Sequence, residues 1–360
     1  MKISTFAKLG DICDVAAGQG APQGDSNYCD NGTPFVKAGN LIELLQGKSE
    51  TDIQKVSEDV AKKHKLKKYP AGSILFAKSG MSCMKGYVYQ LKNDCYVVSH
   101  LAIVKPKKDS SDYIEYCLRH IKPNSLVKDE AYPSISLQDI SNLQIPLPSL
   151  EEQIHISEQL DKCTQIINKH TKELEKYDTL IKSRFIEMFG EPSKNPMNWK
   201  KCSVIEEADC MVPGRDKPKS FTGNIPWITI DDLNVLNKTF KSKKGLGLTS
   251  EEIDEVKREP IPEGSVIMSC VGNLGICSIA AVPMIINQQL HSFQCKHNLI
   301  PEFLMYCLTY QKSYMEMKAN FTTVAYMNKT ICNSIPIIVP PIALQNDFAA
   351  FVQQIDKSKF

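Results

Sequence analysis

The side chains best suited to chemistry are two histidines at similar places in the two halves of the chain. His100 lies within residues 98–101 (VSHL) and His291 within residues 289–292 (QLHS), and cysteines occur in both halves. A histidine can serve as a catalytic base when a nucleophile or a carboxylate is held beside it. No carboxylate or cysteine stands at a paired position in the sequence. We therefore expect each histidine to be a hydrogen-bonded residue at the end of a strand, and we predict no nucleophilic or acid–base site.

The thirteen cysteines are a second group with chemical potential. They are scattered, odd in number, and several lie in apolar runs, as Cys307 and Cys332 do. The chain has no C-x-x-C pair, and the closest spacing, Cys270 to Cys277, has no matching histidine pair. We expect reduced and mostly buried thiols, and we predict no metal site.

A glycine-containing segment, residues 14–20 (DVAAGQG), resembles the cofactor-binding loop of adenine methyltransferases, in which glycines let backbone amides approach the ligand. If the two halves are aligned at Lys8 and Lys201 (201 − 8 = 193), Gly18 and Gly20 correspond to Met211 and Pro213 and the motif is lost. The Asn/Asp-Pro-Pro-aromatic tetrad of that family is also missing, because residues 195–198 (NPMN) lack the second proline and the aromatic residue. A DNA methyltransferase stays as an alternative, but we expect the chain alone not to bind S-adenosylmethionine.

The feature that organises the sequence is a long-range repeat. Residues 70–75 (PAGSIL) match residues 262–267 (PEGSVI), and 262 − 70 = 192. At the same offset Gly80 matches Gly272, and Gln153 matches Gln345 near the ends of the copies. Each copy alternates short apolar runs with Gly, Pro and Asn, which is typical of strands, and has helical spacing around residues 111–121 and 301–318. The sequence predicts an α+β protein with two repeated mixed α/β domains, near residues 6–148 and 197–340.

The connector between the copies has the pattern of one long helix. Residues 149–188 contain no Gly or Pro, and apolar residues recur every seven positions, at Leu160, Ile167, Leu174, Ile181 and Met188. Ser149 and Glu152 form a capping-box signature, and Gly190 marks the far end. At about 1.5 Å per residue such a helix measures roughly 60 Å, so it needs a partner stripe. The C-terminal segment offers one, and we predict an antiparallel coiled coil through Leu344, Phe348, Phe351 and Ile355.

These features together resemble the specificity subunit of type I restriction-modification systems over essentially the whole chain. The resemblance rests on an apolar, proline-rich strand at residues 143–148 (LQIPLP), a Glu-Glu-Gln helix start at residues 151–153, and the junctions at residues 184–190 (RFIEMFG) and 195–200. It implies a target-recognition domain at residues 1–148, a connector helix at 149–190, a second recognition domain at 191–340 and a distal helix at 341–360. The distal helix has at most 19 residues, whereas the family usually has two helices of similar length. The shorter distal helix would change the second of the docking sites that the resemblance implies for methyltransferase subunits.

The same resemblance implies a role without catalysis. Each domain is expected to read one half of a bipartite target in double-stranded DNA, while the helices hold the halves apart and dock methyltransferase subunits. A restriction and translocase subunit joins such complexes. The resemblance places S-adenosylmethionine, ATP and Mg²⁺ on the partner subunits and no cofactor on this chain. A scaffold whose two domains bind proteins instead of DNA is the second alternative.

Composition is compatible with this role. A length of 360 residues with 42% apolar side chains fits two domains, and a net charge of +2 excludes a polycationic DNA coat but not binding through local patches. Lysines cluster within residues 62–68 and, at a place we take as comparable, within residues 238–244. The chain has no long apolar run, and its start does not resemble a signal peptide, so we expect a cytoplasmic protein without membrane contact.

Candidate DNA contacts are polar residues beside Gly or Pro turns, because hydroxyl, amide and basic side chains read bases and hold phosphates. In the first copy the candidates are Gln19, Gln23, Lys37, Asn40, Lys78, Ser79, Tyr132 and Ser134, with Lys62, Lys63 and Lys65 as phosphate-holding lysines. In the second copy they are Arg215, Lys217, Thr229, Asp231, Asp232, Ser269, Asn273 and Tyr326. We predict no metal-binding residues.

Overall fold

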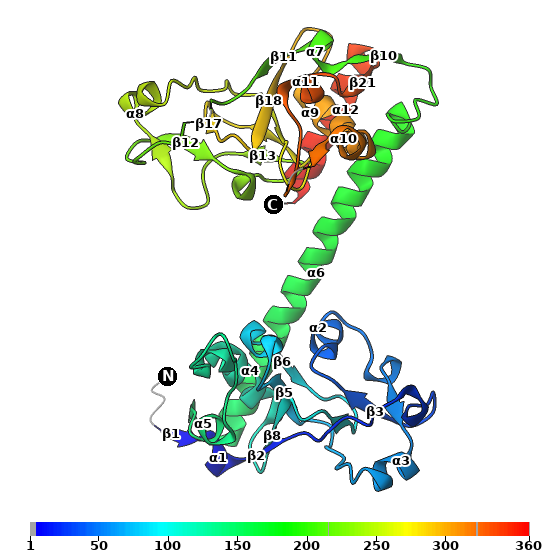
Figure 1. Cartoon of the computed structure of the whole chain (residues 1–360), viewed down its shortest axis with the longest axis vertical. Coiled ribbons are helices and arrows are strands. Elements are labelled where there is room, and N and C mark those ends of the chain that lie inside the picture. Colours follow the sequence, from blue (N-terminus) through cyan, green and yellow to red (C-terminus); the bar gives the residue numbers. More distant parts are fainter. Residues whose placement is uncertain (1–4, 215, 322, 360) are drawn as a thin grey trace. The chain divides into compact units, whose positions relative to one another are not determined.

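The computed structural model describes residues 5–214, 216–321 and 323–359. The chain divides into two compact units, Met1–Asn168 and Lys169–Phe360, here called unit 1 and unit 2. Each unit combines small β-sheets with short helices (Figure 1), so the predicted α+β class is confirmed.

Unit 1 is built around a four-stranded antiparallel sheet in the order β2-β8-β5-β6. Its strands are β2 (Cys13–Ala17), β8 (Leu101–Pro106), β5 (Ile74–Ala77) and β6 (Val88–Gln90). All four residues of β5 are buried, because this central strand is covered on both faces and its sequence, ILFA, is apolar throughout. The amphipathic helix α4 (Ser111–Ile121) packs on β6 and buries Ile114 and Leu118.

A second, three-stranded sheet completes the core of unit 1, in the order β4-β3-β7. Its strands are β4 (Lys55–Val56), β3 (Thr33–Val36) and β7 (Tyr96–Val97), and β3 pairs with β7 in parallel. The remaining elements are the paired strands β1 (Phe6–Lys8) and β9 (Gln144–Pro146) and the helices α1 (Leu9–Ile12), α2 (Asn40–Leu45), α3 (Glu58–Lys63) and α5 (Leu137–Ser141).

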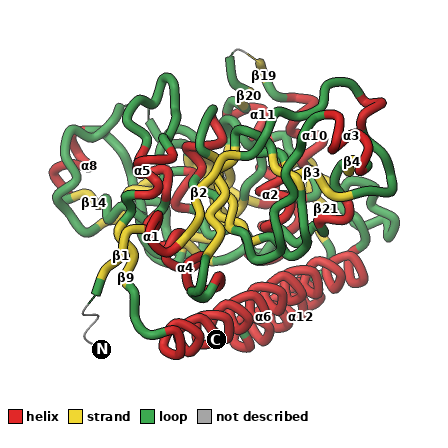
Figure 2. Tube along the Cα trace, turned by 90° about the horizontal axis from the view of Figure 1, so that it is seen from below, coloured by secondary structure: helices red, strands yellow, loops and turns green. Residues whose placement is uncertain are grey.

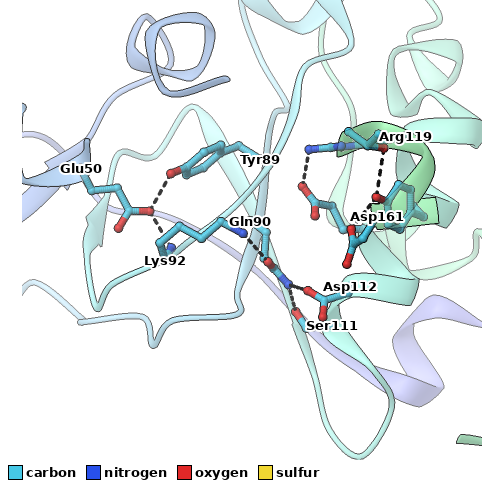
Figure 3. Close-up of polar contacts among 11 residues, drawn as sticks. Glu50, Tyr89, Gln90, Lys92, Ser111, Asp112, Arg119 and Asp161 are labelled. Carbon is cyan, nitrogen blue, oxygen red and sulfur yellow. Dashed lines mark hydrogen bonds and ion pairs between the residues drawn. The ribbon is translucent and has the colours of Figure 1, made fainter. Parts of the chain in front are cut away.

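Buried polar contacts tie the helices of unit 1 to its sheet (Figure 3). The Gln90 amide donates to the Ser111 hydroxyl at 3.0 Å and to the Asp112 carboxylate at 2.7 Å, at the start of α4. The buried Glu50 carboxylate accepts a hydrogen bond from the Tyr89 hydroxyl at 3.0 Å and another from the Lys92 amide at 2.7 Å. Because an unpaired buried carboxylate is costly, these donors fix the loop that carries Glu50 against the sheet.

Unit 2 repeats this arrangement. Its main sheet has the order β11-β18-β15-β16-β13, formed by β11 (Ala208–Met211), β18 (Leu290–Cys295), β15 (Val266–Ser269), β16 (Cys277–Ala280) and β13 (Lys238–Thr239). Its second sheet has the order β14-β12-β17, formed by β14 (Gly247–Leu248), β12 (Ile225–Ile228) and β17 (Ile285–Ile286). Two further pairs are β10 (Lys200–Ser203) with β21 (Pro336–Val339) and β19 (Asn320–Phe321) with β20 (Ala325–Tyr326). The short helices are α7 (Val204–Glu207), α8 (Ser250–Glu255), α9 (Pro301–Thr309), α10 (Lys312–Lys318) and α11 (Lys329–Asn333).

Strand pairing fixes the alignment of the two copies, and it corrects the register at their beginnings. Phe6 pairs with Pro146 in the first copy, and Lys201 pairs with Ile338 in the second. Pro146 and Ile338 are equivalent at the offset of 192 that the two copies share (338 − 146 = 192). Their partners Phe6 and Lys201 are therefore equivalent as well, at an offset of 195 (201 − 6 = 195). The offset of 193 taken from Lys8 is therefore wrong by two residues. Short apolar strands resemble one another at several registers, and only the pairing selects one.

The glycine segment has a structural explanation in this register. At the offset of 195, Gly18 and Gly20 correspond to Pro213 and position 215, so the second copy again lacks the glycines. A Cβ atom on Gly18 would lie 2.2 Å from the carbonyl oxygen of Val98. Gly18 is thus required for close backbone packing within unit 1, which removes the reason to assign it to a cofactor.

A buried glutamine performs the same task in both copies. The Gln153 side chain accepts from the Ser110 amide at 3.0 Å and donates to the Pro148 carbonyl at 3.1 Å. The Gln345 side chain accepts from the Ile300 amide at 3.1 Å and donates to the Asn298 and Pro340 carbonyls at 2.9 and 2.8 Å. Each glutamine therefore joins the start of a sheet-covering helix to the start of the helix that follows the domain.

Replacing Gln345 by Ala is expected to lower the free energy of unfolding by about 1–3 kcal/mol, because it removes the partner of the buried Pro340 carbonyl and of the partly buried Ile300 amide and Asn298 carbonyl. Denaturant unfolding followed by circular dichroism measures this. Gln353→Ala is the control, since Gln353 is an exposed residue of the same helix. Equal stability of the two variants would contradict the role of the glutamine.

The connector is a single helix, α6 (Leu150–Phe189), of 40 residues. It begins as predicted, because the Glu152 side chain accepts from the Ser149 amide at 3.1 Å and the Ser149 hydroxyl accepts from the Glu152 amide at 3.3 Å. It ends at Phe189, and the next residue, Gly190, has a φ of 72°, which is readily available only to glycine.

The distal helix α12 (Ile342–Ser358) lies beside α6 (Figure 2). The Phe348 ring lies 5.3 Å from that of Phe185, whereas the Lys359 ammonium lies 3.0 Å from the carboxylate of Asp178. Positions later in α12 thus contact positions earlier in α6, and the antiparallel packing is confirmed.

The predicted seven-residue seam is wrong in its detail. Of its members in α6 only Ile181 is buried; Met188 is half-buried, and Leu160, Ile167 and Leu174 are exposed. The buried stripe that meets α12 is instead spaced by four residues, at Ile181, Phe185 and Phe189. The reason is that this end of α6 also packs against α9, where Phe303 lies 5.5 Å from Phe185, and a face shared by two helices is wider than a coiled-coil seam.

Candidate nucleic-acid interface

Backbone hydrogen bonds gather five loops of unit 1 at one place. The Ser99 amide donates to the Gln19 carbonyl at 2.8 Å, and the Val98 amide donates to the Val36 carbonyl at 2.9 Å. The fourth and fifth loops join this group because the Lys78 amide donates to the His100 carbonyl at 2.9 Å and the Ile135 amide donates to the Lys78 carbonyl at 2.8 Å. We call these loops, which contain Gln19, Val36, Lys78, His100 and Ile135, loop cluster 1.

Gln19 positions the lysine-rich turn of unit 1. Its side-chain nitrogen donates to the Lys65 carbonyl at 2.7 Å, and its side-chain oxygen accepts from the Lys67 amide. Lys65 has a φ of 52°, a left-handed conformation that turns the chain after α3. The lysines of this turn, Lys62, Lys63, Lys65, Lys67 and Lys68, are all exposed. They form a basic surface whose backbone Gln19 holds beside loop cluster 1, which fits phosphate contact.

Replacing Lys62, Lys63 and Lys65 together by Ala is expected to weaken DNA binding for all sequences and to flatten the dependence of log K on log salt by up to about 3 units, because each lost phosphate contact removes about 0.9. Fluorescence anisotropy at several salt concentrations measures both effects. Lys238, Lys241 and Lys244 are exposed lysines of unit 2 that precede β14, outside loop cluster 1, so their joint replacement by Ala is a charge-matched control with a smaller expected effect. A loss of affinity confined to one DNA sequence would show that these lysines read bases.

The other candidates of unit 1 lie in or near loop cluster 1, and several use their side chains internally. The Lys37 ammonium donates to the Gln54 side chain at 2.6 Å, and the Asn40 side chain accepts from the Lys37 amide at 2.9 Å. The Ser79 hydroxyl lies 2.9 Å from Nδ1 of His100. The Gln23 amide donates to its neighbour, the Ala21 carbonyl, and the half-buried Lys78 takes part through its backbone. Tyr132 and Ser134 are exposed, and Ser134 forms a β-bridge with Ser79.

Unit 2 holds its loops in the same backbone frame. The Asn287 amide donates to the Ile228 carbonyl at 2.9 Å, the Cys270 amide donates to the Gln289 carbonyl at 2.8 Å, and the Met327 amide donates to the Cys270 carbonyl at 2.8 Å. These three bonds repeat those made by Val98, Lys78 and Ile135 in unit 1. The loops form loop cluster 2, and the frame shows that Gln289, not His291, is the counterpart of His100.

The counterpart of the lysine-rich turn follows α8. Lys257 has a φ of 49° and corresponds to Lys65, since 257 − 65 = 192. The lysines at residues 238–244 precede β14 and are therefore not at a comparable place, so that expectation is wrong. The next residue, Arg258, is buried and donates to the carbonyls of Ile286 at 2.7 Å, Gly214 at 2.7 Å and Asp216 at 2.6 Å. Arg258 thus fastens the neighbouring loop of unit 2, as Gln19 does in unit 1.

The candidates of unit 2 fall into three groups. Lys217 and Thr229 line a pocket of about 340 Å³ in loop cluster 2, together with Trp227, Arg258 and residues 287–289. Asp231 and Asn273 are exposed and Tyr326 is partly exposed, whereas Arg215 lies outside the described residues. Asp232 and Ser269 are buried: the Asp232 carboxylate accepts from the Thr229 and Lys243 amides, and the Ser269 hydroxyl from the Ile276 amide. Because these two side chains hold loops inside unit 2, we leave them out of the proposed contact set.

His291 has a partner that the sequence did not reveal. Its Nε2 lies 2.8 Å from the thiol of Cys210, so the expectation that no cysteine is paired with a histidine is wrong here. Burial lowers the pKa of His291 to about 4 and raises the pKa of the Cys210 thiol to about 11. Near neutral pH both groups are therefore uncharged, whereas a nucleophilic cysteine needs a thiolate. A correct prediction of the strand register would have revealed this pair, because the register places Cys210 opposite Phe293, two residues from His291.

In residues 5–214, 216–321 and 323–359, no three side chains of the kinds that ligate metals come together. Across the same ranges, every helix is too short or too polar to span a lipid bilayer.

The fold and the loops define the class of protein. It consists of two copies of one domain, and the copies present different polar side chains on the same backbone frame. A model of the type I restriction modification DNA specificity domain matches residues 2–176 and 210–360. The chain therefore belongs to the type I restriction-modification DNA specificity family, whose role is the recognition of DNA sequence.

Two specificity subunits and one solved structure are similar to this chain over different shares of its length. The putative type I restriction enzyme MjaX specificity subunit of Methanocaldococcus jannaschii is 24% identical over 337 residues, which cover 86% of this chain and 78% of the relative. The MjaIX specificity subunit of the same organism is 30% identical over 145 residues, which are 39% of this chain and only 33% of the relative. The crystal structure of a type I S subunit from M. genitalium has the same fold, with a TM-score of 0.60, 12% identity, and coverage of 99% of this chain and 90% of that one.

Proposed function

We propose that each unit reads one half of a bipartite duplex target through its loop cluster. The observation that carries this proposal is the shared frame of backbone hydrogen bonds with different side chains on it: Val98-Ser99-His100 in unit 1 and Asn287-Gln288-Gln289 in unit 2. A common frame that presents different polar groups suits two readers of different sequences. The exposed lysines beside loop cluster 1 add contact with phosphates.

We propose further that the helices dock methyltransferase subunits. Several apolar side chains of α6 are exposed, and those of Leu160, Ile167 and Leu174 are spaced by seven residues, which places them on one face of the helix. Exposed apolar stripes of this kind mark protein interaction surfaces. In this proposal the methyltransferase subunits carry S-adenosylmethionine, a restriction and translocase subunit uses ATP and Mg²⁺, and this chain supplies specificity without catalysis.

The test is methyl transfer from labelled S-adenosylmethionine to DNA, measured for the purified chain, for a methyltransferase subunit that binds it, and for both together. The chain alone is expected to transfer no methyl groups, and the mixture is expected to modify a bipartite sequence that the methyltransferase subunit alone does not select. Transfer by the isolated chain would favour the methyltransferase alternative. Failure of the mixture to bind any duplex by anisotropy, with intact binding of the partner protein, would favour a protein scaffold.

A further inference from the structure

The loop between β17 and β18 has the sequence Asn287-Gln288-Gln289, and two of its three amides hold the loop itself. The Asn287 side-chain nitrogen donates to the side-chain oxygen of Gln289 at 3.0 Å, and the Gln289 backbone amide donates to the side-chain oxygen of Asn287 at 3.0 Å. The Leu290 amide closes the turn by donating to the Asn287 carbonyl at 3.1 Å. This loop, which we call the amide loop, therefore has a fixed conformation before any ligand arrives.

Gln288, at the tip of the amide loop, is in a different position. Its side chain is exposed, and in the part of the chain that the structure describes its amide group has no hydrogen-bond partner. Like Asn287 and Gln289, it lines the pocket of about 340 Å³, and Lys217 and Thr229 are also in the lining. One amide donor and one amide acceptor are thus available beside a cation, on a preorganised loop.

This pocket depends on a difference between the two copies. Thr229 corresponds to Lys37 of unit 1, since 229 − 37 = 192. In unit 1 the long Lys37 side chain lies over the ring of Tyr28, 4.5 Å from its centre, and donates to Gln54. The Thr229 side chain is shorter and donates to the nearby Asp232, which leaves the space beside the amide loop open. The same frame therefore offers a base a different surface in unit 2.

The chemistry of a free carboxamide selects one base. A glutamine or asparagine side chain can donate to N7 of adenine and accept from its N6 amino group in the major groove, a pair of bonds that no other base offers in that order. We propose that the amide loop of unit 2 is a base-reading site and that Gln288 recognises an A·T pair, with Lys217 holding a neighbouring phosphate. This inference rests on the proposed function and assigns a role to Gln288, which the sequence patterns did not single out.

The test is selection of randomised duplexes by the full chain together with its methyltransferase subunit, for the wild type and for Gln288→Ala. One A·T position in one half-target is expected to lose about 5- to 150-fold of its discrimination, the equivalent of one bidentate contact. The other half-target is expected to stay unchanged. Gln288→Glu keeps the size of the side chain but removes the donor, so it should lose the preference for adenine as well. Ser99→Ala, at the corresponding loop position of unit 1, is the control and should leave the half-target of unit 2 intact.

The outcomes separate this inference from the function on which it rests. A wild-type complex that selects no sequence would remove the proposed function itself. A wild-type complex that selects a bipartite target, combined with a Gln288→Ala variant whose preferences are unchanged at every A·T position, would overturn the inference alone. A normal thermal unfolding curve for Gln288→Ala is expected, because the side chain is exposed, and it shows that any change of preference comes from recognition.

Discussion

Exchanging residues 197–340 for the corresponding domain of a relative with a known target is expected to replace one half of the DNA target and to leave the other half unchanged. The structural reason is that unit 2 has its own sheets, its own buried core and its own loop cluster. The ends of the exchanged segment lie just outside the paired strands β10 and β21, so the exchange moves both strands together. The new complex should prefer the chimaeric target over the old one by about 10³- to 10⁷-fold, the range that separates specific from non-specific binding.

Mapping of methylated bases in cells that carry the wild-type or the exchanged chain measures this outcome. The reciprocal exchange of residues 6–148 is the matched control, and it should change only the other half-target. If either exchange altered both halves, the two units could not be independent readers. If an exchanged, folded chain kept the original target, the recognition surface would lie outside the loop clusters.

Replacing Phe185 by Ala is expected to have the largest effect on stability. The Phe185 ring is fully buried among aromatic rings from three helices, with Phe189 at 5.0 Å in α6, Phe303 at 5.5 Å in α9, and Phe348 at 5.3 Å in α12. Truncation of such a side chain removes its buried area and leaves a cavity, which costs about 3–5 kcal/mol. Unit 2 should therefore unfold at markedly lower denaturant concentration.

Leu180→Ala is the matched control for this substitution, since Leu180 is an exposed apolar residue of the same helix. Denaturant unfolding of both variants gives the difference in free energy. Because unit 1 has a separate core, binding by Phe185→Ala should keep the preference for the half-target of unit 1 after that of unit 2 is lost. A Phe185→Ala variant as stable as Leu180→Ala would mean that the aromatic cluster does not hold α12 and α9 to α6.

The sequence by itself determined the features that depend on neighbours along the chain or on matching of its two halves. The long helix followed from forty residues without Gly or Pro, and its start from Ser149 and Glu152, because capping needs only residues three positions apart. The repeat followed from a shared offset in the Pro-x-Gly-Ser segments before β5 and β15. The family could be predicted from the sequence as well, because the resemblance rests on two divergent copies and a helical connector, which can be recognised in the sequence of the whole chain.

Only the tertiary structure decided which distant groups meet. Periodicity told which residues of α6 are apolar but not which face would be covered, so the exposure of Leu160 and the burial of Phe185 depend on where α9 and α12 pack. Polarity likewise could not separate Gln19, whose amide is used to hold a turn, from Gln288, whose amide is free among the described residues. The contact between Cys210 and His291 spans 81 positions and depends on strand register, and a shift of one residue would turn these side chains to opposite faces. A side chain's role at the surface is set by what lies beside it in space, and the sequence order of this protein does not contain that information locally.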